Sequence, residues 1–504
     1  MSGKLLKRLI LSLLTFVAIA RIFLSLGNSL DEPQVQSRLE LYQANLVLHA
    51  AELDALEDTE LSDSSATFIG NKPLETAEQQ YQNAKNAVRD NLTKLETQLE
   101  RLSLSADDIE QLEAAIAKES EFIDEIDLKL GIIQAREGKT QTALSTWDNL
   151  ILKESEIDIS QTAIILKNLW GRSPDLSENL ISQISVSLNG WFNYAAIEQF
   201  YQLQNNDSAL SSLRAQEQKI ASKAFFKLAL ISGLPVLAGV SGFIFLIFLL
   251  GQLFLQKEKA ILLVNNTLAW QTPWDWEIVW QVLIVGFFFI GQIILPLLIG
   301  ILGLKIGEYT IRYQAVYVLI TYLLMAVAGL SVLYFSIKSF FPLPKDWFQF
   351  KFASNWPLWG FGGYLIAVPL VILISLINQQ FWQGQGGSNP LLFLALQAQD
   401  RVALAIFFFT ACIAAPIFEE ILFRGFLLPS LTRYFPVWGA IFASSFLFAI
   451  AHLSLSEVLP LTMLGIVLAV VYTRSRNLLA SMLVHCLWNT GTLFSLFILG
   501  SGVN

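Results

Sequence analysis

The sequence predicts an all-α protein, a bundle of about nine transmembrane helices with a soluble α-helical domain near the N-terminus. Two observations support this fold class. The 504 residues are 54% hydrophobic and only 15% charged, which is too apolar for an ordinary soluble protein. Apolar stretches long enough to cross a bilayer core of about 30 Å recur along the chain, and they lack the alternating pattern of outer-membrane strands.

Charge and cysteine content exclude other classes of protein. The net charge of −9 gives no reason to expect nucleic acid as a partner, because proteins that bind it usually carry a basic patch. The two cysteines, Cys412 and Cys486, both fall in apolar stretches. Neither a disulfide framework nor a zinc-binding cysteine pair is therefore expected.

The first predicted element is a membrane anchor at residues 1–26. An apolar run at 9–26 follows Lys4, Lys7 and Arg8, which is the pattern of a signal peptide or signal anchor. No convincing small-x-small cleavage site accompanies the run. We therefore expect the anchor to stay uncleaved.

The second predicted element is a soluble helical domain at residues 27–227. This segment is polar and acidic, and its apolar residues recur at helical spacing. Four of its residues occupy offsets typical of a tetratricopeptide unit: Leu130, Gly131, Ala143 and Trp147. A plain helical hairpin explains the same pattern more simply, so the tetratricopeptide assignment stays an alternative.

The remaining chain is predicted to form transmembrane helices at 228–390 and a C-terminal transmembrane domain at 391–504. After the anchor, spans are expected near residues 229–255, 279–303, 313–336, 357–378, 402–430, 437–455, 457–473 and 478–500. The Gly-rich stretch 383–390 has no lysine and follows no predicted strand, so we interpret it as a flexible linker and not as a phosphate-binding loop.

Basic residues predict the orientation of the spans. With a cytoplasmic N-terminus, most basic residues of the short loops lie on the inner side, as the positive-inside rule requires. The inner set is Lys257, Lys259, Lys338, Lys345, Lys351, Arg433, Arg474 and Arg476. The outer set is smaller, although four basic residues at 214–227 precede the second span. Residues 27–227 would then lie outside, periplasmic or lumenal, in a bacterial inner membrane or a thylakoid-type membrane.

Charged residues of the sequence EEILFR stand within the predicted span 402–430. A charge at membrane depth costs several kcal/mol or more, so Glu419, Glu420 and Arg424 are functional candidates. Residues four apart on a helix share a face, whereas adjacent residues diverge by about 100°. Arg424 should therefore pair with Glu420 as a structural link, and Glu419 should remain free to react.

Two of the three histidines fall in the following spans; the third is His49. The sequence FAIAH places Phe448 and His452 on one helix face, and HCLWN does the same for His485 and Asn489. Each pair alone could be an ordinary helix–helix hydrogen bonder. Two carboxylates, two imidazoles and a carboxamide in three nearby spans favour catalysis instead.

These motifs, EExxxR, FxxxH and HxxxN in this order, resemble those of the CAAX-protease and bacteriocin-processing (CPBP or Abi) family of intramembrane endopeptidases. That family includes the type II prenyl endopeptidases. The resemblance covers roughly residues 390–500. It implies that Glu419 acts as general base with His452 as its partner, activating water for attack on a peptide carbonyl. It also implies that His485 and Asn489 stabilise the oxyanion, supported by Glu420, Arg424 and Phe448.

The metal requirement stays open at this point. The family is often labelled metalloprotease, and Glu419, His452 and His485 could fill three zinc positions with water as the fourth ligand. The chain has no HExxH pair to fix such a site on one helix. Direct activation of water by glutamate and histidine is therefore the preferred mechanism.

Another function class also uses buried charges. A membrane scaffold or transporter could employ the same residues as an ion relay, but the spans show no inverted repeat. We expect a membrane-associated peptide or protein as the substrate, prenylated or not, and a protein partner for residues 27–227. Because Glu419 lies well inside its predicted span, water must reach it through a cavity that protein encloses.

Overall fold

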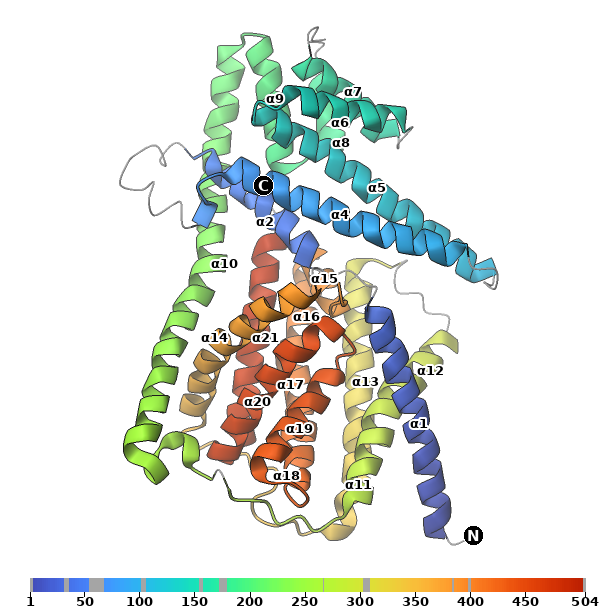
Figure 1. The fold of residues 1–504 in the computed structure, drawn as a ribbon, viewed down its shortest axis with the longest axis vertical. Helices are drawn as coiled ribbons and strands as arrows, with labels where there is room; N and C mark the ends of the chain where they lie inside the picture. Colours follow the sequence, from blue (N-terminus) through green and yellow to red (C-terminus); the bar gives the residue numbers. More distant parts are fainter. Residues whose placement is uncertain are drawn as a thin grey trace. The chain divides into compact units, whose positions relative to one another are not determined.

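The computed structural model describes residues 3–30, 36–53, 68–100, 106–153, 157–171, 179–265, 267–301, 309–382, 385–397 and 400–501 (Figure 1). These residues form helices and connecting loops without a β-strand, which confirms the predicted all-α class. The chain divides into two compact units. One comprises residues 1–32 and 235–500 and is called the membrane unit; the other comprises residues 33–234 and 501–504 and is called the helical unit.

The helical unit packs its helices around a core of aromatic and aliphatic side chains. Its helices are α2 (Gln36–Ala51), α4 (Pro73–Leu99), α5 (Ala106–Arg136), α6 (Thr140–Leu152), α7 (Ile157–Trp170), α8 (Leu180–Ser187), α9 (Gly190–Leu203) and the first part of α10 (Asp207–Gln256). Trp147 of α6 is fully buried against α5. A Cβ at Gly131 would lie 2.4 Å from its indole nitrogen, so glycine is required where this hairpin closes.

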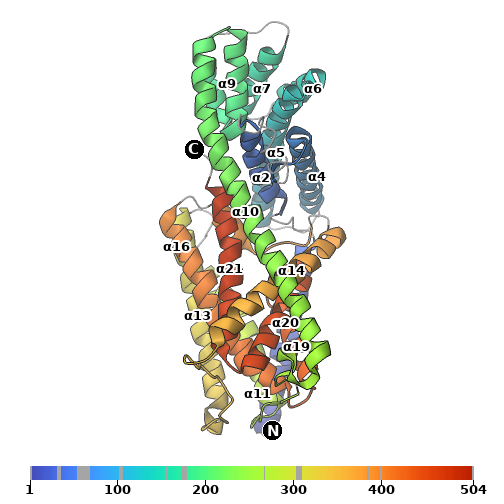
Figure 2. The ribbon, with the colours of Figure 1, turned by 90° about the vertical axis from the view of Figure 1, so that its left-hand side faces the viewer.

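The membrane unit contains the segments that are long and apolar enough to cross a membrane. There are eight among the described residues: Lys4–Ser29, Asp207–Lys259, Trp276–Ile301, Ile311–Phe340, Trp356–Trp382, Arg401–Leu431, Leu455–Ser475 and Leu478–Gly500. The protein is therefore an integral, multi-pass membrane protein. Helix α10 is continuous over 50 residues and belongs to both units (Figure 2). Its Pro235 marks the division, because proline removes a hydrogen bond from the helix interior.

Several spans combine more than one helical segment. In chain order after α1 (Gly3–Ser29) and α10, the unit contains α11 (Trp276–Gln281), η4 (Val282–Ile294), α12 (Leu295–Ile301), α13 (Ile311–Ile337), α14 (Trp356–Trp382), α15 (Pro390–Gln397), α16 (Arg401–Phe409), η7 (Thr410–Ala414), α17 (Ala415–Glu419), η8 (Glu420–Leu427), α18 (Leu428–Leu431), α19 (Val437–Ile450), η9 (Leu455–Glu457), α20 (Val458–Ser475) and α21 (Leu478–Gly500). The segments η4, η7 and η8 are π-helical.

One of the nine predicted spans differs from expectation. The stretch at 437–455 forms α19, a helix of only 14 residues, which is not among the eight segments of spanning length. It begins after Pro436 and ends in a turn at residues 451–454, where Leu453 has a positive φ of 57°. Such a helix rises about 21 Å, less than a bilayer core of about 30 Å. His452 therefore follows a helix too short to carry it across the membrane.

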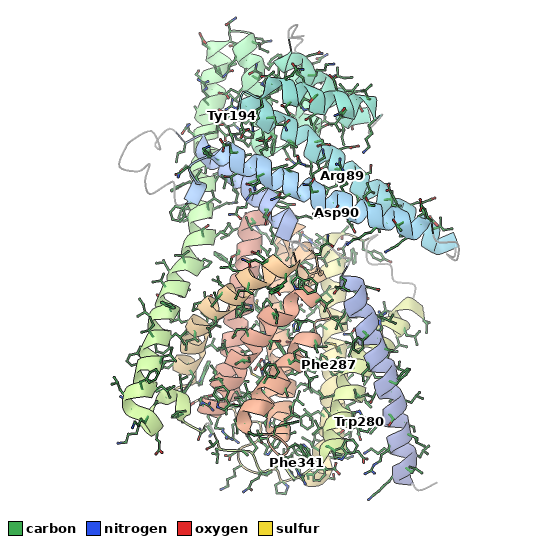
Figure 3. The ribbon with its side chains drawn as sticks, viewed as in Figure 1. Arg89, Asp90, Tyr194, Trp280, Phe287 and Phe341 are labelled. Atoms are coloured by element: carbon green, nitrogen blue, oxygen red, sulfur yellow. The ribbon has the colours of Figure 1, made fainter. Side chains whose placement is uncertain are left out.

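The N-terminal helix α1 packs along the segment formed by α11 and η4. Near its start, Lys7 and Arg8 form ion pairs with Glu277 at 3.1 and 3.0 Å. Further along, the indole nitrogen of Trp280 donates to the hydroxyl of Thr15 at 2.6 Å. Trp280 and Phe287 of this segment are labelled in Figure 3, and Phe287 is buried in the core that reaches the candidate site.

Candidate active site

The residues singled out in the three C-terminal motifs meet around one cavity. Glu419, His452, His485 and Asn489 all line a cavity of about 480 Å³ in the membrane unit, together with Phe448. They come from α17, the turn after α19, and α21. Most of the other lining side chains are apolar, although η4 and α13 also contribute the polar side chains of Gln292 and Tyr322. The fold thus places several polar groups on an otherwise hydrophobic wall.

Glu420 and Arg424 form a buried ion pair beside this cavity. Both side chains are fully buried, and Nη1 of Arg424 donates to Oε1 of Glu420 at 2.9 Å. The other terminal nitrogen, Nη2, donates to the carbonyl of Gly465 at 3.3 Å. The guanidinium also lies 4.3 Å from the centre of the Phe448 ring. The i,i+4 spacing therefore produces the structural link that the sequence predicts.

Glu419 has a different environment from its neighbour. Its Oε1 accepts a hydrogen bond from the hydroxyl of Tyr322 at 3.0 Å. Its Oε2 lies 3.8 Å from Nε2 of His485 and has no hydrogen-bond partner among the described residues. One oxygen is thus held and the other is available beside the cavity. Oε2 of Glu420 likewise lacks a hydrogen-bond partner among the described residues, so the feature that separates the two carboxylates is that Glu419 lines the cavity.

His485 lies between the two carboxylates. Its Nδ1 is 3.0 Å from Oε1 of Glu420, and its Nε2 faces Glu419. Whenever Nδ1 carries a proton it donates to Glu420, which fixes the orientation of the ring. The histidine in contact with Glu419 is therefore His485. His452 forms no ion pair with Glu419 within 4 Å among the described residues; its Nδ1 donates to the carbonyl of Phe448 at 2.9 Å.

Phe448 connects the charged residues to both histidines. Its ring packs edge-on against His452 at 4.9 Å and against His485 at 5.8 Å, measured between ring centroids. Its side chain is fully buried, and the Arg424 guanidinium lies over its face. A favourable cation–π contact thereby fixes the ring that orients the two imidazoles.

Asn489 satisfies a backbone carbonyl that the π-helical turn leaves free. In η7 the amide of Ala415 donates to Thr410, five residues earlier. The next donor in that pattern would be Pro416, which has no N–H. The carbonyl of Ala411 accepts instead from Nδ2 of Asn489 at 2.7 Å. One amide hydrogen of Asn489 is thus used for structure, and the other remains for a ligand in the cavity.

Comparison with known families agrees with this geometry. Residues 401–491 match a family model described as type II CAAX prenyl endopeptidase Rce1-like. The match contains all three motifs. This segment is therefore similar to the type II CAAX prenyl endopeptidases. A search of curated proteins and a search of solved structures each found no match.

The match of residues 401–491 to this family model supports endopeptidase activity within a membrane. The matched segment contains Glu419, His452, His485 and Asn489, but the cavity extends beyond it. Residues from η4, α13, α14 and α15 contribute to the cavity wall, and these segments lie before residue 401. The matched segment thus supplies the motif residues, and earlier helices enclose them.

Sequence analysis did not identify several polar residues of this cavity, among them Tyr322 and Glu457. Tyr322 belongs to α13, and no local motif marks it. Glu457 precedes α20, and its Oε1 accepts from the amide of Asn389 at 2.9 Å. A systematic search for acids in or beside apolar spans would have found Glu457, since such residues are functional candidates by default. Only the fold could reveal Tyr322.

The described residues do not form a ready metal site. Among them, no group of three His, Cys, Asp or Glu side chains is placed to hold a metal ion. Glu419, His452 and His485 line the same cavity, but Nδ1 of His452 is engaged with the backbone and Nδ1 of His485 with Glu420. These hydrogen bonds leave Nε2 of each imidazole as the atom that could bind a metal ion, which is also how metal-binding histidines are commonly held.

Proposed function

We propose that this protein is an intramembrane endopeptidase in which Glu419 activates water to hydrolyse a peptide bond. The proposal rests mainly on the Glu419 carboxylate. Tyr322 holds one of its oxygens, while the other has no partner among the described residues and lies beside a cavity. A positioned carboxylate with an available oxygen suits a general base. The match of residues 401–491 to the type II CAAX prenyl endopeptidase model is independent support.

The reaction follows from these positions. Glu419 takes a proton from water as the water oxygen bonds to the peptide carbonyl carbon, and the carbonyl electrons move onto the oxygen. The glutamic acid then gives this proton to the departing nitrogen as the C–N bond breaks. One water is consumed, a carboxylic acid and an amine are released, and the Glu419 carboxylate is regenerated.

The remaining motif residues have complementary roles in this proposal. His485 and Asn489 share a face of α21 and line the cavity with Glu419. They are proposed to donate hydrogen bonds to the tetrahedral intermediate, where such donors accelerate acyl transfer strongly. His452 lines the same cavity and has Nδ1 bound to its own helix. We propose that its Nε2 orients the attacking water.

The proposed substrate is a membrane-associated peptide or protein segment. Apolar side chains such as Val318, Met325 and Leu461 form much of the cavity wall, which favours a hydrophobic segment. The matched family model is named for prenylated substrates. Prenylation is therefore one variable of the test.

Hydrolysis should be measured with purified protein in liposomes. One internally quenched fluorescent peptide would carry an apolar segment, and a second would end in a farnesylated CAAX sequence. Glu419→Gln is expected to lower turnover by about 10³-fold without changing the melting temperature, because glutamine can still accept the Tyr322 hydrogen bond. Glu277→Gln, which alters a carboxylate paired with Lys7 and Arg8, is the control. Near-normal turnover by Glu419→Gln would refute the proposed mechanism.

We also propose a cytoplasmic N-terminus, with the helical unit on the outer side. The support is the excess of basic residues in alternate loops of the membrane unit. Cysteine at exposed Ser145, in a chain with Cys412 and Cys486 replaced by alanine, should react with an impermeant reagent in intact cells. Labelling only after lysis would reverse the orientation.

A further inference from the structure

Tyr322 is the direct hydrogen-bond donor to Glu419, and it comes from outside the matched segment. The two residues are 97 positions apart, and the hydroxyl lies 3.0 Å from Oε1. Tyr322 also lines the cavity. Any effect of this hydroxyl on Glu419 therefore depends on how α13 packs against α17.

The chemical nature of this donor distinguishes the two adjacent glutamates. Glu420 contacts the guanidinium of Arg424 and the ring of His485. Glu419 is held by a neutral phenol. A hydrogen bond from a cation is roughly twice as strong as one between neutral groups and neutralises the carboxylate. A phenol instead orients one oxygen and leaves the negative charge available to take a proton.

The packing of α13 holds Tyr322 in place. Its ring lies edge-on to Phe418, the residue before Glu419, with 6.1 Å between ring centroids and an interplanar angle of 84°. Gly329 stands seven residues after Tyr322, two helical turns later on the same face. A Cβ at Gly329 would lie 3.1 Å from the Phe418 ring. Glycine thus permits the close approach that brings the hydroxyl to Glu419.

A second glycine extends this close packing to η4. A Cβ at Gly329 would also lie 3.0 Å from the carbonyl oxygen of Gly286. Phe287, next to Gly286, stacks on Phe418 with 6.2 Å between ring centroids. Small residues allow membrane helices to approach backbone to backbone. Three segments, η4, α13 and α17, are therefore fixed against one another around Phe418.

We propose that Tyr322 is a positioning residue for the general base: it holds Oε1 of Glu419 so that Oε2 faces the cavity and the attacking water. This inference rests on the proposed function. It adds that catalysis depends on a residue of α13, a helix that lies before the segment with the three motifs. The phenol acts through Glu419 and takes no proton itself.

The test is the hydroxyl deletion Tyr322→Phe, assayed with the quenched apolar peptide in liposomes. We expect kcat to fall about 10- to 100-fold, the scale of a misplaced catalytic group, while KM and the melting temperature stay at wild-type values. Tyr317→Phe is the matched control, because Tyr317 lies on the same helix, outside the cavity lining, and its hydroxyl has no hydrogen bond among the described residues. A merely structural role would lower the melting temperature instead.

A coupling measurement provides a second readout. Glu419→Asp shortens the side chain by one methylene and withdraws the carboxylate from the phenol. If Tyr322 acts through Glu419, adding Tyr322→Phe to Glu419→Asp should lower kcat further by much less than it does in the wild type. Full additivity of the two effects would overturn the positioning role.

The outcomes separate the two proposals. If no cleavage depends on Glu419, the proposed function fails and the Tyr322 inference fails with it. If cleavage depends on Glu419 but Tyr322→Phe retains the wild-type kcat, the proposed function stands and only the positioning role is rejected.

Discussion

Each unit of the protein contains a cluster of paired charges, fully buried in the membrane unit and partly exposed in the helical unit. In the membrane unit, Arg424 neutralises Glu420. In the helical unit, Arg136 forms ion pairs with Glu52 and Glu198. The membrane cluster has an additional carboxylate, Glu419, which lines a cavity and has no basic group paired with it within 4 Å among the described residues except the His485 ring. Paired charges thus indicate structure, whereas a carboxylate that lines a cavity indicates chemistry.

The helical cluster joins segments that are distant in sequence. Arg214 of α10 also pairs with Glu198 of α9, at 2.9 Å. The indole of Trp191 donates to Glu52 at 2.9 Å, and the guanidinium of Arg136 lies 5.8 Å from that ring. These contacts link α5, α9, α10 and the residues after α2. The cluster therefore stabilises the arrangement of helices within its unit.

The largest effect on stability is expected in the membrane cluster. Arg424→Met leaves Glu420 fully buried without its guanidinium, and breaking a buried pair in this way costs about 3–5 kcal/mol. Unfolding in a detergent of fixed composition measures this free energy. The double variant Glu420→Gln with Arg424→Met removes both charges and should recover much of the loss. A single variant as stable as the wild type would contradict the structural assignment.

A smaller loss is expected in the helical cluster. Arg136→Met should destabilise the helical unit by about 1.5–3 kcal/mol, the value of hydrogen bonds to charged groups, because Arg214 still pairs with Glu198. Hydrogen exchange of α5 and α9 in the full chain would report this locally. Turnover of the quenched peptide should stay unchanged below the unfolding temperature. A large loss of turnover would show that the clusters are not independent.

The same variant has a predicted pH dependence. Burial raises the pKa of Glu198, but the charges and hydrogen bonds of Arg136 and Arg214 outweigh it and hold the pKa below its usual 4.5. Since the folded pKa is depressed, the stabilisation is complete above pH 4.5 and is lost as the pH falls through the folded pKa. The difference between wild type and Arg136→Met in exchange protection should therefore shrink in acid. If the difference in exchange protection grew in acid instead, the lowered pKa assigned to Glu198 would be wrong.

Removing the helical unit should have a weaker and more selective effect. Deletion of residues 36–206 retains α1 and all of α10. If the unit selects substrates, cleavage of a membrane protein that accumulates in Glu419→Gln cells should slow by roughly an order of magnitude, because a tethered binding domain raises effective concentration. Turnover of the short peptide should not change. Equal losses on both substrates would assign the unit a supporting role instead.

Chelation is expected to have the smallest effect. Removal of divalent metal from the purified protein with a chelator should leave hydrolysis unchanged, because the preferred mechanism activates water with Glu419 and the histidines. Turnover before and after treatment measures this, with zinc added back as the control. Loss of activity that zinc restores would support the metal alternative and require Glu419, His452 and His485 to rearrange.

Local sequence patterns predicted some features of the membrane unit and could not predict others. Apolar stretches separated by loops predicted most spans because the bilayer fixes their length. The pairing of Arg424 with Glu420 followed from helical spacing, since both residues lie within one turn. No local pattern could reveal the contact of Tyr322 with Glu419, because it depends on packing between spans. The role of Asn489 at the Ala411 carbonyl also required the π-helical turn to be seen.

The short helix α19 illustrates a further reason for error. Hydropathy placed a span at 437–455 because apolar residues lie on both sides of the turn at 451–454, which itself contains His452 and Ser454. The backbone reverses there with Leu453 at a positive φ, a conformation uncommon for leucine. An average over the whole stretch does not register a short turn between two apolar helices. The position of His452 at the cavity depends on this turn.

The π-helical segments within the span Arg401–Leu431 make the position of Glu419 sensitive to the number of residues that precede it. Segments η7 and η8 flank α17. A π-helical hydrogen bond joins residues five apart, whereas an α-helical one joins residues four apart, so each π-helical turn contains one additional residue. A single deletion between Thr410 and Ala414 would rotate Glu419 by about 100° relative to the preceding turns. The carboxylate would then leave the cavity although every motif residue was still present. An alignment gap in this stretch thus has the same meaning as a substitution of Glu419.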